Sequence, residues 1–211
     1  MANIVGFLVV AAVVIVTPGP DTALTIRNTL LGGRRGGVLT AIGVAAGQAT
    51  WAVATSGGIA TLLAASAPVF RTVRLAGAAY LILLGLQAFR ETLRARGAPT
   101  SPADAGPSAP LVSASAGVRQ GLINNLTNPK MAVFFPALLP QFAPPGDGAF
   151  LGLLLLGLLF SSMTLAWLTA YAFAVATVGD LLFRPWIRHM LETITGAVLI
   201  GLGLQLAMER R

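Results

Sequence analysis

Long uncharged apolar stretches dominate the pattern of hydrophobic and polar positions along this chain. Six of them follow one another, separated by charged residues, and they cover 1–20, 36–70, 75–89, 131–146, 148–179 and 193–208. A helix that crosses a membrane needs about 20 mostly apolar residues, with basic residues at its ends. The pattern therefore predicts an all-α integral membrane protein with six transmembrane helices.

The helices are expected near Asn3–Val16, Val38–Leu63, Val69–Arg94, Gly117–Phe142, Ala149–Val178 and Ile187–Ala207. Between the third and the fourth, residues 97–113 hold four prolines among small and polar residues. That composition is typical of a mobile linker. It divides a single membrane domain, 1–211, into a first repeat over 1–96 and a second over 114–211.

Each repeat has a helix break near its start. Thr17-Pro18 interrupts the first predicted helix, and Thr127-Asn128-Pro129 interrupts the fourth. Because three helices are an odd number, the second repeat must enter the membrane from the opposite side. The expected architecture is therefore two inverted three-helix repeats with helices 1 and 4 broken, a plan common in secondary transporters.

Charge and composition fit this prediction. Of the residues, 55% are hydrophobic and only 10% are charged, whereas a soluble domain carries about 25% charged residues. The net charge of +7 would suit nucleic acid, but the arginines form short clusters between apolar stretches, as they do when they orient a membrane protein. With six spans and the N-terminus outside, nine arginines fall on the cytoplasmic side and four outside. We therefore expect both termini outside the cell and no nucleic-acid partner.

Several other functions lack the residues that they would need. The N-terminal stretch has no basic region and ends in Thr17-Pro18-Gly19-Pro20 rather than a cleavage motif, so it is interpreted as the first span and not as a signal peptide. The chain has no cysteine, which excludes thiol chemistry. A lone histidine, His189, makes no metal site, and we expect no cofactor.

The two breaks also hold the charged residues that stand apart from the arginine clusters. Asp21 follows the first break, and Lys130, the sole lysine, follows the second. A helix break frees backbone N–H and C=O groups, and a helix N-terminus favours a carboxylate. Asp21 would suit an ammonium group and, in the empty site, a proton, because burial disfavours a charged carboxylate. The residues expected to bind a substrate are Thr17, Pro18, Gly19, Pro20, Asp21, Asn124, Asn125, Asn128, Pro129 and Lys130, with Asp21 also coupling to protons.

Simpler interpretations remain for the same residues. Asp21 could start a helix at the membrane surface, and Lys130 could anchor a helix end in the headgroup region. Stripes of small residues, Ala41–Ala49 and Gly43–Gly47, favour helix packing within the chain over a homo-oligomer. Weaker candidates for contact with a substrate lie outside the breaks: Gln48, Trp51, Tyr80, Gln87, Trp167, Tyr171 and Glu192.

The chain resembles the lysine exporter/homoserine-threonine resistance (LysE/RhtB) family of bacterial amino-acid exporters over nearly its whole length. The similarity rests on separate motifs in the right order, which are Thr17-Pro18-Gly19-Pro20, 32–36 with 43–47, 75–81 with Leu84-Gly85, 121–130, Phe134-Phe135 and 139–142. The resemblance implies a multi-pass protein of the bacterial inner (plasma) membrane that exports amino acids or close derivatives, driven by the proton gradient. Its partners would be the amino-acid substrate, protons and the lipid bilayer.

Three alternatives are weighed against an exporter of amino acids. One is an exporter of metal ions or another small solute in the wider superfamily, and export of metal ions would need clustered Cys, His or carboxylate ligands. A membrane-embedded enzyme would need a nucleophile beside a base, and a passive scaffold would leave two charged helix breaks unexplained. The resemblance does not distinguish among the amino acids that its members export.

Overall fold

The computed structural model describes residues 4–65, 114–143 and 148–182, together with scattered positions between 72 and 86 and between 193 and 208. All secondary structure in this part of the chain is helical. The linker and most of the predicted third and sixth helices, with Tyr80, Gln87 and Glu192, lie outside the described residues. The six-helix count and the repeat plan therefore stay predictions.

The first predicted helix is confirmed, and it ends where the sequence breaks it. Helix α1 spans Ile4–Val16. The amide of Thr17 makes the last bond of the helix, to the carbonyl of Val13 at 3.0 Å. Pro18 and Pro20 have no N–H to continue the helix, so the chain leaves the helical path and resumes it at Pro20.

Helix α2 spans Pro20–Ala65 and folds back on itself at Gly33, whose φ of 63° and ψ of −164° are not helical. We call 20–32 the first arm and 34–65 the second arm. The sequence assigned no helix to 17–37, and for 20–32 this was wrong. The first arm has Asp21, Thr25 and Asn28 on a buried face. Because this buried face is polar, the helix produces no apolar stretch that would predict it from the sequence.

The second break is followed by irregular helix. Helix α4 spans Ala114–Leu126 and α5 spans Pro129–Val133. The chain continues as a π-helix, η3, over Phe134–Leu138 and a 3-10 helix, η4, over Leu139–Phe142. Pro136 and Pro140 lack the N–H groups that a regular α-helix would use here. The predicted helix Gly117–Phe142 is therefore helical over most of its length, but it is broken before Pro129 and residues 134–142 are not α-helical.

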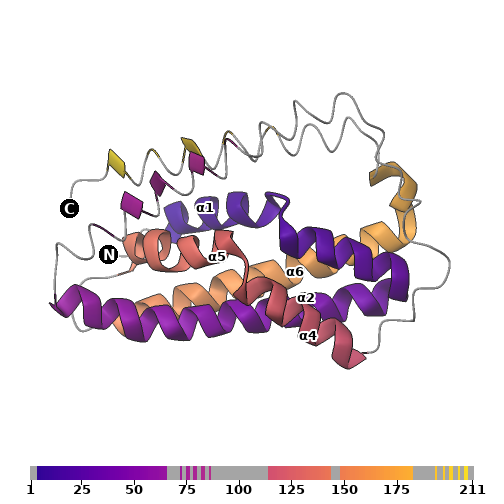
Figure 1. Ribbon diagram of the computed structural model, residues 1–211, viewed down its shortest axis with the longest axis horizontal. Helices are drawn as coiled ribbons and strands as arrows, with labels where there is room; N and C mark the ends of the chain where they lie inside the picture. The colour runs from indigo at the N-terminus through magenta and orange to yellow at the C-terminus, as the bar shows by residue number, and fades with distance from the viewer. Residues whose placement is uncertain are drawn as a thin grey trace.

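Helix α6 spans Ala149–Leu182 and runs along the whole length of the described bundle (Figure 1). It packs with α2, α1 and η4 around a core that contains many aromatic side chains. Two segments among the described residues are long and apolar enough to cross a membrane, Pro20–Gly58 and Ala149–Thr177, and Ile4–Val16 is a shorter apolar helix. The first of the two contains the turn at Gly33, so its two arms run in opposite directions (Figure 1).

Glycines let the second arm and α4 cross in backbone contact. A Cβ atom on Gly43 would lie 2.1 Å from the carbonyl oxygen of Val118, and one on Gly121 would lie 2.2 Å from that of Thr40. A Cβ on Gly47 would lie 2.8 Å from the side chain of Asn125. The small-residue stripe therefore packs within the chain, as the sequence favoured.

Candidate functional site

The carboxylate of Asp21 is buried and receives three hydrogen bonds from the second break. Asn124 Nδ2 donates to Oδ1 at 2.7 Å, and Asn125 Nδ2 and Asn128 Nδ2 each donate to Oδ2 at 2.9 Å. Asp21 is only 8% exposed. It lies in the first turn of α2, so the interpretation as a helix start is correct, but its side chain is buried and not at a surface.

The ammonium group of Lys130 is bound in turn by the first break. Its Nζ donates to the carbonyl oxygen of Val14 at 3.0 Å and to that of Thr17 at 3.2 Å. Val14 belongs to the last turn of α1 and Thr17 directly follows it, and their carbonyls are left without intrahelical partners where Pro18 and Pro20 interrupt the helix. Lys130 is therefore held inside the bundle by the C-terminal end of a helix, where a positive charge is favoured.

The two breaks are bound reciprocally. The first provides the acid and the carbonyls, and the second provides the amides and the base. No hydrogen bond between the described residues joins Asp21 directly to Lys130, because each has partners of its own. The structure thus brings one buried acid and one base into a single site while it keeps them apart.

Asp21 and Lys130 occupy equivalent positions after their breaks. In each case the new helix begins with a proline, Pro20 or Pro129, and the charged residue follows it. The residue before each proline accepts the first helical bond, from Ala23 to Gly19 at 3.0 Å and from Ala132 to Asn128 at 3.1 Å. Proline suits this first position because it has no N–H to leave unpaired. The structural counterpart of Pro129 is therefore Pro20, not Pro18 as the Thr-Pro similarity suggested.

Both breaks lie half-way along their elements. Helix α1 and α4 have 13 residues each, which is about 20 Å at 1.5 Å per residue, and the first arm has the same length. Figure 1 shows α1 and α5 in one half of the long axis, and the first arm and α4 in the other. The site therefore lies near the middle of the bundle.

The other predicted site residues differ in burial. Thr17 is buried, and its hydroxyl donates to Val13 O at 2.7 Å. Pro18 and Gly19 are half-buried, and a Cβ on Gly19 would lie 3.4 Å from Lys130 Nζ. Pro20 and Pro129 are exposed, so they shape the breaks but do not face the site.

Comparison with known proteins identifies the family of this chain. The LysE type translocator family matches the chain over residues 12–210. This chain belongs to that family. The resemblance found in the sequence is confirmed, and with it the location in a membrane and a role in transport.

Individual relatives of this translocator cover the chain to different extents. It is 32% identical over 204 residues to an uncharacterized membrane protein of Vibrio cholerae serotype O1, with 97% of this chain and 96% of that protein covered. YrhP, an uncharacterized membrane protein of Bacillus subtilis (strain 168), is 26% identical over 210 residues, 99% of this chain and 100% of that protein. A leucine efflux protein of Salmonella typhimurium is 33% identical over 136 residues, 64% of this chain and 61% of that protein. No solved structure matches.

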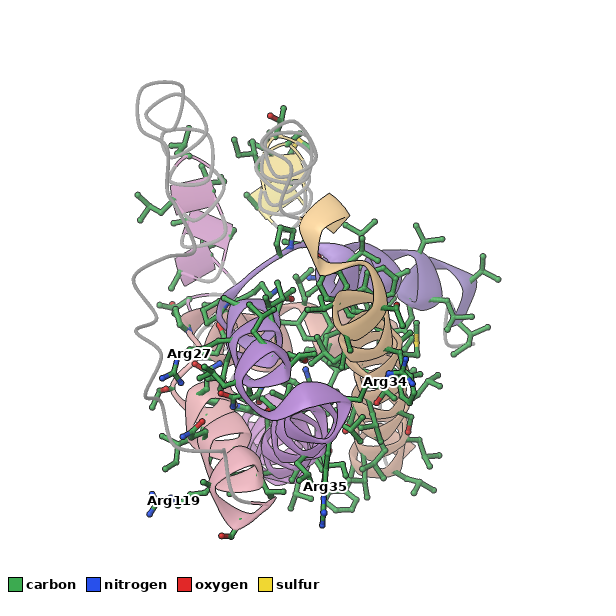
Figure 2. The ribbon with its side chains drawn as sticks, turned by 90° about the vertical axis from the view of Figure 1, so that its right-hand side faces the viewer. Arg27, Arg34, Arg35 and Arg119 are labelled. Carbon is green, nitrogen blue, oxygen red and sulfur yellow. The ribbon has the colours of Figure 1, made fainter. Side chains whose placement is uncertain are left out.

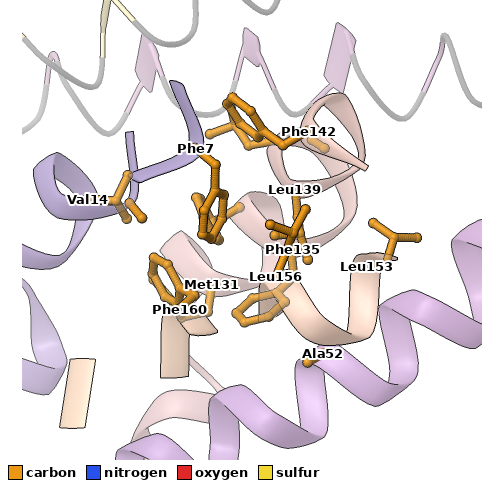
Figure 3. Close-up of a cluster of buried hydrophobic side chains, with 14 of the residues drawn as sticks. Phe7, Val14, Ala52, Met131, Phe135, Leu139, Phe142, Leu153, Leu156 and Phe160 are labelled. Atoms are coloured by element: carbon orange, nitrogen blue, oxygen red, sulfur yellow. The ribbon is translucent and has the colours of Figure 1, made fainter. Parts of the chain in front are cut away.

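In this translocator a dense apolar cluster fills one side of the site (Figure 3). Phe134 stacks on Phe160 with ring centroids 4.4 Å apart, and Phe135 meets both rings edge-on at 5.6 and 5.8 Å. Phe7 and Phe142 close the cluster between α1 and η4, 5.7 Å apart. Such packing excludes water from the half of the bundle that holds α1.

The other side of the site is polar, and four exposed arginines lie at that end of the bundle. Asn28 Nδ2, fully buried on the first arm, donates to Thr40 Oγ1 at 2.8 Å and to Gln120 Oε1 at 2.9 Å. This network joins the first arm, the second arm and α4. Figure 2 looks onto this end of the translocator and labels Arg27, Arg34, Arg35 and Arg119, all of them exposed.

Sequence reasoning gave little weight to two side chains that reach the site from the second arm. Gln48 is 2% exposed and its Nε2 lies 3.7 Å from Met131 Sδ. Trp51 Nε1 donates to the carbonyl of Asn125 at 3.4 Å, and its ring stacks on Phe135. A signal for Gln48 was present in the sequence, because it is a single amide within the uncharged stretch 36–70.

Proposed function

We propose that this translocator exports neutral amino acids or close derivatives across the bacterial inner membrane, as a multi-pass secondary transporter that exchanges them for protons. The substrate binds where the two helix breaks meet. The observation that carries this proposal is the pairing in one site of a buried carboxylate, Asp21, with the ammonium group of Lys130, a half-buried residue whose Nζ is bound by the first break.

An amino acid has the complementary charges. Its α-ammonium group suits Asp21, and its carboxylate suits Lys130 together with the amide donors of Asn124 and Asn128. One acid and one base favour a zwitterion with a neutral side chain, since a dibasic substrate would need a second carboxylate. The leucine efflux protein among the relatives supports neutral amino acids as the first substrates to test.

Proton coupling is assigned to Asp21. In the empty site Lys130 balances the charge of this carboxylate. When the substrate leaves, a proton takes the place of its ammonium group. One carboxylate that binds either the ammonium or the proton, but not both, is sufficient for exchange.

The position of the site supports alternating access through two inverted repeats of three helices. Helix α1, the first arm and α4 are each about 20 Å long, and a bilayer is about 40–45 Å thick with its headgroups. The breaks then lie near the midplane, where broken helices of secondary transporters place their substrates.

The arginines support an orientation. Arg27, Arg34, Arg35 and Arg119 lie in the half of the bundle formed by the first arm, its turn and α4 (Figure 2). Basic residues concentrate on the cytoplasmic side, which supports an orientation with this end inside the cell and α1 with the N-terminus outside. The polar network of Asn28 then faces the cytoplasm and the aromatic cluster faces the outside.

The experiment is uptake of labelled amino acids into inverted membrane vesicles, with and without a proton gradient. We expect uptake of leucine or another neutral amino acid, lost when the gradient is dissipated. Absence of uptake over a broad amino-acid panel, together with uptake of a divalent metal ion, would replace this proposal with the metal-exporter alternative. Uptake that ignores the gradient would remove the proton coupling alone.

A further inference from the structure

Gln48 has a buried amide that the described protein leaves almost without hydrogen bonds. The residue is 2% exposed, and its Oε1 has no hydrogen-bond partner among the residues that the structure describes. Its Nε2 has one partner, the thioether sulfur of Met131 at 3.7 Å, and a thioether is a weak acceptor. A primary amide buried in this way is destabilising unless something else satisfies it.

A second unpaired amide oxygen lies beside it. Asn125 is fully buried and its Nδ2 donates to Asp21, while its Oδ1 has no hydrogen-bond partner within 4–65, 114–143 and 148–182. Oδ1 lies against Gly47, since a Cβ on that glycine would be 2.8 Å from it. Gly47 is the neighbour of Gln48 on the second arm, so both unpaired oxygens lie where this arm meets the second break.

Both atoms are acceptors, and this defines the ligand that would satisfy them. Each needs an N–H or O–H donor, and a carboxylate supplies neither. An α-ammonium group supplies three N–H donors. Three segments contribute acceptors around the second break: the carboxylate of Asp21, which accepts from Asn125; the Oδ1 of Asn125; and the Oε1 of Gln48, whose Nε2 contacts Met131 in α5.

We propose that Gln48 is a substrate-binding residue of the exporter, and that it selects substrates with a primary ammonium group by accepting one of the three N–H donors. The inference rests on the proposed function, because it concerns the same site. It adds a residue from the second arm to a site otherwise built from the two breaks, and it assigns to that residue the recognition of the amine.

The test is the replacement Gln48→Met in the full-length protein, reconstituted into proteoliposomes. Methionine has a similar volume and no amide, so it removes the unpaired oxygen without leaving a cavity. We expect the KM for leucine, or for the best substrate of the wild-type protein, to rise at least tenfold. We also expect the melting temperature without substrate to stay equal or to rise, because an unsatisfied buried amide has been removed.

Selectivity provides a second readout. The N-methyl derivative of the same amino acid has one N–H fewer when charged. The wild-type protein should prefer the parent amino acid, and Gln48→Met should lose most of this preference. The matched control is Gln141→Met, which makes the same chemical change at a half-buried residue whose Nε2 bonds Ala137 O at 3.1 Å, and it should leave the KM unchanged.

Two outcomes would overturn the inference while the proposed function stands. One is a Gln48→Met protein that transports with unchanged KM and unchanged preference for the primary amine, as expected if a water molecule alone satisfies Gln48. The other is a lower melting temperature with a lower maximal rate at constant KM, which would make Gln48 a packing residue. If Gln48→Met does not fold, Gln48→Asn retracts the amide by one carbon and must raise the KM. A wild-type protein that transports no amino acid would remove both proposals together.

Discussion

Asn128 holds its own helix with one side-chain atom and Asp21 with the other. Its Oδ1 accepts from the amide of Lys130 at 3.0 Å and so caps α5, while its Nδ2 donates to Asp21 Oδ2 at 2.9 Å. One amide therefore joins the geometry of the second break to the charge of the first. A substitution that alters the geometry of one break should therefore also alter the contacts of the other.

The first prediction uses this double role. Asn128→Asp keeps an oxygen to cap α5 but places a carboxylate against Asp21. We expect export to fall at least tenfold while the cap, worth about 1 kcal/mol, is largely retained. The measurement is transport at matched membrane abundance. Asn128→Ser keeps the cap without the charge and should retain more activity; an Asn128→Asp protein as active as wild type would contradict the assigned contact.

The second prediction concerns the two charges. Asp21→Asn and Lys130→Met should each abolish export, and each should lower thermal stability by about 3 kcal/mol, the scale for one buried charge left without its counterpart. The double variant should be more stable than either single one, because no isolated charge remains. Thermal unfolding of the three purified proteins checks this order. Near-normal, proton-coupled export by Asp21→Asn would reduce this aspartate to an ordinary helix-start residue.

The third prediction concerns the orientation in the membrane. Because the chain has no cysteine of its own, an introduced cysteine can be labelled without background from other thiols. A cysteine introduced in place of exposed Arg35 should react with an impermeant thiol reagent in inverted vesicles and not in intact cells. A cysteine in place of exposed Ile4, at the start of α1, should show the opposite pattern. The reverse result at both positions would show that the protein has the opposite orientation in the membrane.

The fourth prediction concerns the crossing of the second arm with α4. Gly43→Ala places a methyl group 2.1 Å from the backbone oxygen of Val118, which forces the helices apart and should cost about 1–3 kcal/mol or more. Gly58→Ala is the matched control on the same arm, since its Cβ would meet nothing within 4 Å. The control should be neutral or more stable by up to about 1 kcal/mol. Equal melting temperatures for the two variants would show that the crossing is looser than described.

The sequence was sufficient for those parts of the fold that depend on apolar length or on proline. It located α1 and α6 closely, as well as both breaks. It failed for the first arm, because a helix that buries Asp21, Thr25 and Asn28 against α4 has no apolar stripe to detect. It also failed for η3, where the position of Pro136 changes the hydrogen bonding within a stretch that has the composition of a helix.

The sequence was sufficient to locate the candidate site from its residue types, but not to predict the hydrogen bonds within it. Proline, asparagine and an isolated charge marked both breaks, because such residues are costly in an apolar segment unless they are used. Which amide binds which charge depends on the crossing of segments about a hundred positions apart in sequence, and no local pattern encodes it. Gln48 was underrated for the same reason, since its burial depends on Met131 and Asn125 from the other half of the chain.

The turn at Gly33 couples the orientations of the two arms of α2. A single residue joins its two arms, so there is no loop to absorb movement between them. A Cβ at this position would meet nothing within 4 Å, yet its φ of 63° with a ψ of −164° belongs to a region that glycine alone adopts readily. The angle between the arms is therefore set by this one backbone unit together with the contacts beside it, where Gly36 packs against the carbonyl of Asn28 and Asn28 donates to Thr40. Any tilt of the first arm relative to the second would therefore have to be taken up in the two torsions of this one glycine, or the second arm would have to tilt with it.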